Sequence, residues 1–168
     1  MKVKFLPILL LLLYQCSPGK NEPYIASITE WQNKRNTELQ DTTGWLALEG
    51  LFWLDGGKFD FGSAQNNHYV FPEAFPELAG TIELNELGEV IIYPSENSSQ
   101  IKLNGNLISV PVKLTTDNPG PPDKLWYADE WLFYAISRFE GKAIRLIHTK
   151  SPELSRFKGM DFFPIDEN

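Results

Sequence analysis

The stretch of residues 44–72 places the strongest constraint on how this chain folds. It opens with an apolar run over residues 45–54 that carries a single charge, Glu49, and the run stops at Asp-Gly-Gly over residues 55–57. Glycine reaches positive φ without steric cost, so this tripeptide predicts a tight hairpin turn. Beyond it, phenylalanines alternate with charged residues, and a polar loop then leads into a short apolar run that ends at Pro72. The stretch therefore predicts two strands, a polar loop and a third, short strand.

Short apolar and β-branched segments continue through the rest of the chain, separated by turn residues at regular spacing. Asn104-Gly105 is the strongest of the hairpin signals, and Pro111 is tolerated as the residue that opens a strand. No helical periodicity interrupts this series, so about ten short strands predict an antiparallel β-sandwich. After Pro72 we expect strands over residues 81–84, 90–93, 101–103, 107–110, 112–114, 125–127, 131–137 and 143–148.

One helix is predicted ahead of the strands, over residues 27–40. Ser27 and Glu30 have the spacing of a capping box, in which each side chain satisfies a backbone donor of the first turn. One face of this helix carries Ile28, Trp31, Arg35 and Leu39, a pattern typical of a face that docks on a core. The expected architecture is mainly β, with a single domain over residues 25–168 that consists of a sandwich and this helix packed on it.

Residues 1–16 are typical of a lipoprotein signal peptide. Two lysines precede an apolar core of about ten residues, which is too short for a bilayer that needs about 20. The tetrapeptide Leu-Tyr-Gln-Cys at 13–16 resembles a lipobox, although Gln15 stands where a small residue is usual. Cys16 is the sole cysteine, so it cannot form an internal disulfide, and diacylation there would supply the two chains that stable anchoring needs. The alternative is a plain secretory signal. Residues 17–24 have the composition of a flexible tether.

The charge of the chain excludes two classes of partner. The net charge is −7, and removal of the signal takes away two lysines and no acidic residue. Nucleic acids demand a basic surface, and anionic lipid attracts basic segments, so neither is an expected electrostatic partner. We expect a protein of the bacterial cell envelope, held at a membrane by its lipid, whose partner is an envelope protein or a small-molecule ligand.

Several short blocks together carry a family resemblance. They comprise Trp31, Arg35, residues 44–46, 48–51 and 53–54, Gly57, residues 61–63 and 103–105, Arg138 and residues 157–164. This set, spread from Trp31 to Asp166, resembles the bacterial and archaeal family called domain of unknown function 1684. The resemblance implies that the chain corresponds to the N-terminal part of that family, and that an activity seated in the C-terminal part of longer members is not expected here. The family has no established biochemical function, so the resemblance implies none.

The order of pieces from Gly57 to Ile147 is also similar to a forkhead-associated sandwich. The similar pieces are residues 62–63 at a strand end, 66–67 in a loop, a strand into 72, a return at 80–82, and the turn at 103–105. That family recognises phosphothreonine with an arginine directly after the glycine and a Ser-x-x-His in the next loop. Here Ser63 stands at the arginine position, and residues 75–79 supply neither serine nor histidine. Because bidentate phosphate binding loses its guanidinium donor, a phosphothreonine peptide is not an expected partner.

Motifs for catalysis or metal binding are not found in the sequence. Metal sites usually need clustered ligands, whereas the two histidines, His68 and His148, are isolated and Cys16 is assigned to the lipid. Neither a nucleophile elbow nor a phosphate-binding loop is present, although the members of a triad can lie far apart in sequence. We therefore expect no metal or cofactor and favour a non-catalytic binding or structural module over a small envelope hydrolase. The hydrolase requires one histidine in a cleft beside a hydroxyl or carboxylate, whereas the module places both on open surface.

Aromatic and arginine residues provide the candidate ligand site. Rings can stack on a ligand while guanidinium groups bind its acid, and the candidates are Trp45, Trp53, Arg138 and Arg145, with Trp126 and Trp131 as further members. Aromatic residues also suit the core of a sandwich, with the arginines as cross-strand partners, and this alternative is the favoured one. For Trp53 in particular we predict a buried ring that shares a face with Leu51 and with Phe59 or Phe61.

Overall fold

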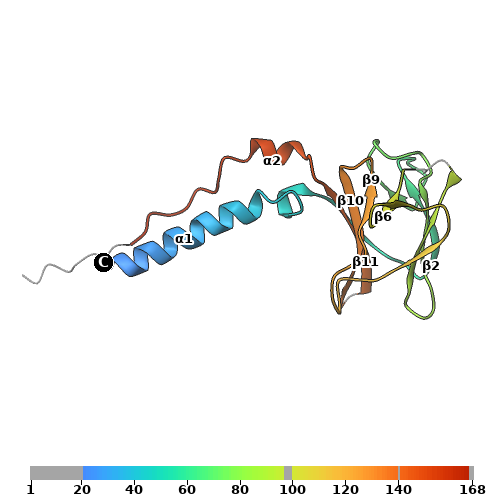
Figure 1. Cartoon of the computed structure of the whole chain (residues 1–168), viewed down its shortest axis with the longest axis horizontal. Helices are drawn as coiled ribbons and strands as arrows, with labels where there is room; N and C mark the ends of the chain where they lie inside the picture. Colours follow the sequence, from blue (N-terminus) through green and yellow to red (C-terminus); the bar gives the residue numbers. More distant parts are fainter. Residues whose placement is uncertain (1–20, 97–99, 140, 167–168) are drawn as a thin grey trace, which may run out of the picture.

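The structure, a computed structural model, describes residues 21–96, 100–139 and 141–166. The predicted signal peptide with Cys16, and residues 17–20 of the predicted tether, lie outside this part. Two β-sheets form a sandwich, and a helix with an extended segment leaves it on one side (Figure 1). The six-stranded sheet has the order β1 (Leu48–Trp53), β11 (Gly141–His148), β10 (Trp131–Arg138), β9 (Leu125–Tyr127), β6 (Lys102–Leu103), β7 (Asn106–Leu107). The five-stranded sheet has the order β3 (Tyr69–Val70), β2 (Gly57–Gly62), β4 (Gly80–Leu84), β5 (Val90–Pro94), β8 (Val112–Leu114).

The core lies between the two sheets and explains why they pack face to face. Every second residue of each strand points inward, so Phe61 and Ile82 of one sheet meet Phe133 and Ile144 of the other, all of them at most 1% exposed. Burial of one such side chain stabilises a fold by about 1.5–3 kcal/mol. The predicted mainly-β sandwich is confirmed.

The sequence located the remaining strands to within two residues, except the strand predicted over residues 107–110, where β7 covers only Asn106–Leu107. The turns at 85–88 and 104–105 join antiparallel pairs, in which Leu84 faces Val90 and Leu103 faces Asn106. Asn104 and Gly105 have φ of 50° and 87°, as a two-residue hairpin turn of the primed type requires. One pair departs from the antiparallel prediction, because β2 and β3 run parallel.

The predicted hairpin at residues 55–57 is wrong. β1 pairs with β11 in the six-stranded sheet, whereas β2 pairs with β3 and β4 in the five-stranded sheet. At the end of β1, Leu54 still donates its backbone N–H to Lys142 (2.9 Å), and the next backbone N–H, of Asp55, turns to the hydroxyl of Tyr69 (3.1 Å). The Asp-Gly-Gly tripeptide therefore carries the chain from one sheet to the other, and Gly57 has a φ of 122° on the way.

The start and the facing of β1 also differ from the prediction. Residues 45–47 form a short 3-10 helix, η1 (Trp45–Ala47), and the strand begins at Leu48. The inward ring is Phe52, stacked on Phe71 at 4.8 Å between centroids, and Trp53 beside it is 43% exposed. The predicted burial of Trp53 is therefore wrong, because successive side chains of a strand point to opposite faces.

Helix α1 (Glu22–Leu39) begins earlier than the predicted start at Ser27 and so includes part of the predicted tether. Its N-cap is Asn21, whose side chain accepts from the backbone N–H of Tyr24 (3.3 Å), and a proline stands in the first turn, where its missing N–H costs nothing. The hydroxyl of Ser27 donates to the carbonyl of Tyr24 instead of capping the helix (2.7 Å). The predicted capping box is therefore not formed.

Helix α1 does not pack on the sandwich as predicted. Figure 1 shows it extending away from the six-stranded sheet beside the C-terminal segment. Trp31 meets Phe162 of that segment at 5.7 Å between ring centroids, and Asn36 Oδ1 accepts from the backbone N–H of Met160 (2.9 Å). None of the described α1 residues is buried, since the helix offers one narrow apolar stripe among polar residues.

A second helix, α2 (Pro152–Arg156), was not predicted from the sequence because it is only a little over one turn long. Ser151 caps it, accepting from Glu153 N–H (3.4 Å), and Pro152 opens it. Leu154 packs with Ala47 of η1 and with Leu132 and Ile147 of the sheet. Helix α2 and η1 thus cover one end of the outward side of the six-stranded sheet and leave the rest of that side uncovered by them.

Candidate functional site on the outer side of the six-stranded sheet

Three strands place a mixed aromatic and cationic surface on the side of the six-stranded sheet that faces away from the core. Arg145 of β11 lies in register between Leu51 of β1 and Tyr134 of β10, and Trp53 stands two residues beyond Leu51. Side chains directly opposite one another on neighbouring strands share a face, so these residues form one surface. We call the surface formed by Leu51, Trp53, Tyr134 and Arg145 the outer face. Leu51 and Trp53 are each 43% exposed on it.

Trp45 is placed over the outer face by the turn that precedes β1. Asp41 Oδ1 accepts from the backbone N–H of Thr43 (2.7 Å), and its carbonyl accepts from Gly44 N–H (2.9 Å). A Cβ on Gly44 would lie 2.8 Å from the carbonyl oxygen of Glu38, so glycine permits this close approach to the end of α1. The η1 turn then points Trp45, which is 67% exposed, toward Arg145.

Arg145 and Trp45 line a small pocket of about 100 Å³, whose other lining residues are Thr43, Gly44, Leu48 and Ile147. The guanidinium carbon of Arg145 lies 6.0 Å from the Trp45 ring centroid, at the limit of a cation–π contact. Its Nη1 donates to the hydroxyl of Tyr134 over a long 3.4 Å. Its Nε is buried and has no hydrogen-bond partner among the described residues. The pocket therefore presents donors of a cation beside an aromatic ring.

The charge of Arg145 is not matched by an adjacent carboxylate. Within the described residues, no Asp or Glu oxygen lies within 4.0 Å of its guanidinium group. A partly buried cation without an opposite charge beside it lowers the stability of the fold, and an anion in the pocket would offset this loss. Arg145 contributes to lowering the pKa of Asp117, but only as the smallest of several causes.

Arg138, the other candidate arginine, is committed to a structural contact. It binds Asp117 bidentately, Nη1 to Oδ1 at 2.9 Å and Nη2 to Oδ2 at 2.7 Å, and Asp117 also accepts from the backbone N–H of Ser137 (3.0 Å). These hydrogen bonds, that of Arg138 first, hold the pKa of Asp117 below its ordinary value. Arg138 stands four residues from Tyr134 along β10, about 13 Å at 3.3 Å per residue. The structure thus brings Trp45, Trp53 and Arg145 together and leaves Arg138 apart.

The two further tryptophans do not join the pocket. Trp131 is 6% exposed in the core, and Trp126 is half-buried beside Leu132 and Leu154 at the covered end of the sheet. The pocket instead uses Leu48 and Ile147, and Tyr134 contacts Arg145 from the neighbouring strand; the sequence analysis did not single out these three residues as ligand-binding. Only the strand register could have identified them, because register decides which residues flank Arg145.

Both histidines lie beside a carboxylate. His68 Nε2 is 2.8 Å from Asp55 Oδ2, with 41% and 68% of the two side chains exposed, and the ring stacks on Phe59 at 4.2 Å. His148 Nδ1 is 3.7 Å from Glu49 Oε1, and its ring stacks on Trp131 at 4.1 Å. In the part of the chain that the structure describes, no Ser or Thr hydroxyl is hydrogen-bonded to either ring. The carboxylate and ring contacts orient each imidazole, but no hydroxyl nucleophile of the described residues is hydrogen-bonded to it.

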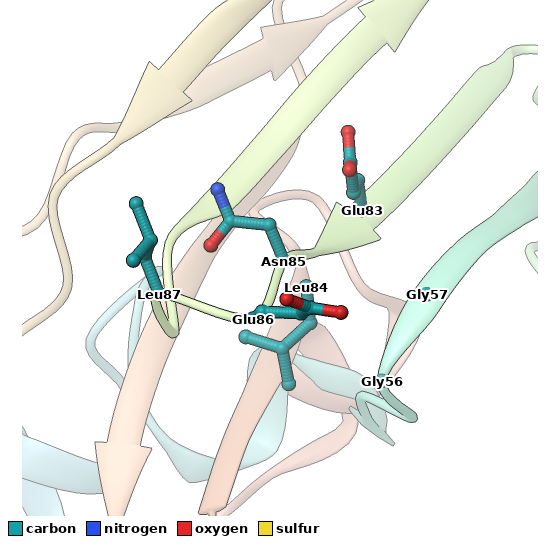
Figure 2. Close-up of a pocket in the computed structure, with 7 residues that line it drawn as sticks. All are labelled: Gly56, Gly57, Glu83, Leu84, Asn85, Glu86 and Leu87. Atoms are coloured by element: carbon teal, nitrogen blue, oxygen red, sulfur yellow. The ribbon is translucent and has the colours of Figure 1, made fainter.

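A larger depression of the surface, of about 640 Å³, lies around the turn between β4 and β5. Figure 2 shows its lining residues, and the side chains of Glu83 and Glu86 do not converge on a common point. The polar groups there serve the turn itself, since Asn85 and Glu89 bond each other through side chain and backbone (3.0 and 2.8 Å). Glu83 accepts from the Tyr93 hydroxyl (2.5 Å) and so raises the pKa of that phenol. This depression therefore provides no free set of ligand-binding groups.

The described residues, 21–96, 100–139 and 141–166, offer neither a clustered metal site nor a membrane-spanning helix. These residues contain no group of three or more His, Cys, Asp or Glu side chains that could hold a metal ion. The same ranges contain no helix that is both long and apolar enough to cross a bilayer. The predicted lipid attachment at Cys16 lies outside them.

Comparison with known proteins gives structural likenesses only. No family model and no curated protein matches the chain. One similar solved structure is the FHA domain of the CT664 protein from Chlamydia trachomatis, at 14% identity and a TM-score of 0.39, covering 56% of this chain and 80% of that one. Another is Mycobacterium tuberculosis EmbR in complex with a low-affinity phosphopeptide, at 11% identity and a TM-score of 0.38, covering 76% of this chain and 31% of that one. At these values no residue role and no ligand is transferred to this chain.

Proposed function

We propose that the protein is a non-catalytic binding module of a bacterial cell envelope, held at a membrane by lipid on Cys16, that binds an anionic ligand on its outer face. The observation that carries this proposal is the Arg145 guanidinium, which has a buried Nε without a hydrogen-bond partner and no carboxylate within 4.0 Å among the described residues. A carboxylate or a phosphate accepts from a guanidinium with two oxygens and so fits this group.

The surroundings of Arg145 favour a ligand that is more than a bare ion. Trp45 offers an exposed ring at the pocket, and Trp53 and Leu51 add apolar surface beside it. An aromatic or aliphatic portion of the ligand can pack on these side chains while its acidic group reaches Arg145. The acidic character of the whole chain fits a module that selects its ligand by local contacts instead of by its overall charge.

The binding proposal is tested by thermal melts of the fragment from Asn21 with a panel of N-acetylated amino acids and phosphate monoesters. We expect at least one acid to raise the melting temperature of the wild type, because a ligand that binds the folded state stabilises it. The same acid should leave Arg145→Gln unchanged. Arg156→Gln is the matched control, since Arg156 lies exposed on α2 and pairs with Glu153 (2.8 Å). Equal shifts in all three proteins, or none in any, contradict the proposal.

The envelope location and the family assignment are further parts of the proposal. Membership in domain of unknown function 1684 is supported by the blocks between Trp31 and Asp166, and the lipid by the sole cysteine after an apolar run. Cys16→Ala should abolish labelling by a palmitate analogue and move the protein from the membrane fraction to the soluble one, or leave its signal uncleaved. Unchanged labelling and fractionation in this variant would refute the anchor and leave the binding site untouched.

Phosphothreonine is not the ligand we propose. The backbone N–H of Ser63 bonds the carbonyl of Pro76 (2.9 Å), so the two loops lie together without a guanidinium group at the position that phosphothreonine recognition uses. A phosphothreonine peptide should bind no more tightly than its unphosphorylated form. Micromolar binding that is lost on dephosphorylation, and is kept in Arg145→Gln, would show that these loops do recognise phosphate.

The 2.8 Å contact of His68 with Asp55 supports a second candidate, a small envelope hydrolase. A carboxylate that orients an imidazole is one half of a hydrolytic site, and a hydroxyl or a water would have to provide the other half. This candidate predicts hydrolysis of a chromogenic ester by the wild type that His68→Ala abolishes. Equal, background rates for the two proteins would remove it.

A further inference from the structure

Strand β1 is an edge of the six-stranded sheet, because no strand pairs with its far side among the described residues. The direction in which each backbone N–H and C=O group of β1 points follows from Leu54, whose N–H points to β11 and donates to the carbonyl of Lys142. Backbone groups of a strand alternate in direction, so those of Leu51 and Trp53 point away from β11. Asp55 has the same phase, and its N–H points outward to the hydroxyl of Tyr69. The backbone of residues 51–53 is therefore presented at the edge.

Between Gly50 and Trp53, this edge lacks the features with which proteins usually protect an exposed strand. Edge strands are normally short, charged, bulged or interrupted by proline, because a free row of N–H and C=O groups pairs with other chains. β1 has six residues, and Glu49, its one charged residue, stands at an irregularity of the register near the start of the strand. From Gly50 to Trp53 the pairing with β11 is regular and the side chains are apolar. Leu51 and Trp53 remain 43% exposed there.

We propose that the ligand of the outer face is an extended peptide segment of another protein, which adds to β1 as a further strand and places an acidic side chain opposite Arg145. This inference rests on the proposed function, because it names the ligand of the same site. It adds the backbone of residues 51–53 to the set of groups that hold the ligand.

The geometry of a sheet determines which residues of the peptide would matter. An added strand lies about 4.8 Å from β1 and so about 10 Å from β11, a distance that the side chains of a glutamate and of Arg145 bridge together. The peptide residue opposite Leu51 has its side chain on the outer face, and so does the residue two positions away, opposite Trp53. The favoured peptide therefore has an acidic and a large apolar residue two positions apart.

The charge on the outer face is the reason to propose an acidic peptide and not a second copy of this chain. A second β1 would bring only Glu49 as an acid, and that carboxylate lies 3.7 Å from His148 Nδ1 within its own chain. It would also add to a net charge that is already −7 in each copy. An extended peptide gains backbone hydrogen bonds along the edge and specificity from its alternate side chains.

The test uses short capped peptides of about six residues, the usual length of a strand. The parent peptide has glutamate and leucine two positions apart within threonine and lysine, and a second peptide has the two in reversed order, since the added strand can run in either direction. A third variant carries N-methyl groups on the two amides that would donate to β1, and a fourth has glutamine in place of glutamate. Binding to the fragment from Asn21 is measured by calorimetry, and its mass by light scattering.

We expect one of the two orders to bind, and both N-methylation and the glutamine variant to weaken it by about tenfold or more, because each removes hydrogen bonds to the site. Arg145→Gln should remove the difference between glutamate and glutamine, whereas Arg156→Gln should keep it. An N-methylated peptide that binds as tightly as its parent overturns the added strand, and so does a dimer of the chain that the peptides cannot dissociate. If N-acetylglutamate binds through Arg145 and neither peptide order binds more tightly, the strand addition fails and the proposed function stands. If no acid or peptide distinguishes wild type from Arg145→Gln, both fail.

Discussion

The two faces of the six-stranded sheet are built from the same three strands and differ in almost everything else. The inner face presents Phe133, Ala135, Ile144 and Leu146, each of them fully buried against the second sheet. On the outer face stand Arg145 and Tyr134, each directly adjacent in sequence to two of these residues, together with the exposed Leu51 and Trp53 of β1. The named side chains of the inner face are buried. On the outer face Leu51 and Trp53 are 43% exposed, and no strand among the described residues pairs with the far side of β1.

This difference shows that adjacent residues of a strand can lie on opposite faces of a sheet, one in the core and the other on the surface. Phe52 and Trp53 are adjacent large aromatic residues of β1, yet only Phe52 stacks inward on Phe71. Side chains alternate with a period of two, so a single step of register decides whether a ring stabilises the fold or remains available to a ligand. Substitutions on the two faces should therefore separate stability from binding.

The largest effect is expected on the inner face. Phe133→Ala removes a ring that is 0% exposed and that contacts Phe61, Phe71 and Phe75 at 5.9–6.2 Å between centroids. The expected cost is about 3–5 kcal/mol of the free energy of unfolding. Since a domain is held together by about 5–15 kcal/mol, this variant should be close to unfolded in chemical denaturation. Phe133→Leu is the milder control, and a midpoint equal to wild type in Phe133→Ala would contradict the assignment of this face as core.

An intermediate effect is expected where an arginine of the outer side is paired. Arg138→Gln removes the bidentate contact with Asp117, and at pH 7 we expect a loss of about 1 kcal/mol or less, because the pair is partly exposed. The folded pKa of Asp117 is lowered, so its contribution is present above the unfolded value of about 3.9 and is lost as the pH falls through the folded pKa. Urea denaturation at pH 7 and below pH 3 should show the difference between wild type and variant shrinking in acid. A difference that is constant or grows in acid would contradict the pairing.

The effect on stability expected for Trp53→Ala is no larger than that of Arg138→Gln. The ring is 43% exposed, so its removal should cost about 1 kcal/mol or less and lower the melting temperature by only a few degrees. The same variant should weaken binding of an acidic peptide, which depends on this apolar surface. Phe52→Ala, one residue earlier, is the matched comparison and should destabilise the protein much more. Equal losses of stability in the two variants would show that the outer face is also part of the core.

Most of the fold followed from local patterns. Alternating apolar residues located the strands, and Asn104-Gly105 determined a hairpin that the structure confirms, because that dipeptide accepts positive φ at both positions. The same kind of reasoning failed at residues 55–57, where glycine freedom serves a crossing between sheets. A turn signal states that the chain changes direction; it does not state which strands then pair.

The candidate site was predicted in part. Of the four candidate residues, Trp45, Trp53 and Arg145 lie on one surface, whereas Arg138 is bound to Asp117 and lies apart. The two arginines are equivalent in the sequence, seven positions apart on one hairpin. They differ because a loop brings Asp117 to Arg138, whereas no carboxylate of the described residues pairs with Arg145. No local sequence pattern predicts the path of that loop.

By itself, the sequence determined most of the strands, the presence of one N-terminal helix, the sandwich class and the supply of tryptophan and arginine, because these depend on side-chain periodicity, turn chemistry and composition. The tertiary structure decided that β1 pairs with β11 and that Phe52 points into the core. It also decided that α1 contacts the C-terminal segment, through Trp31 and Phe162, instead of packing on the sheets. Each of these is a contact between residues distant in the chain, chosen by which apolar surfaces can be buried together. The surroundings of Arg145 were decided in the same way, since the absence of a hydrogen-bond partner for its Nε among the described residues depends on what the rest of the fold places beside it.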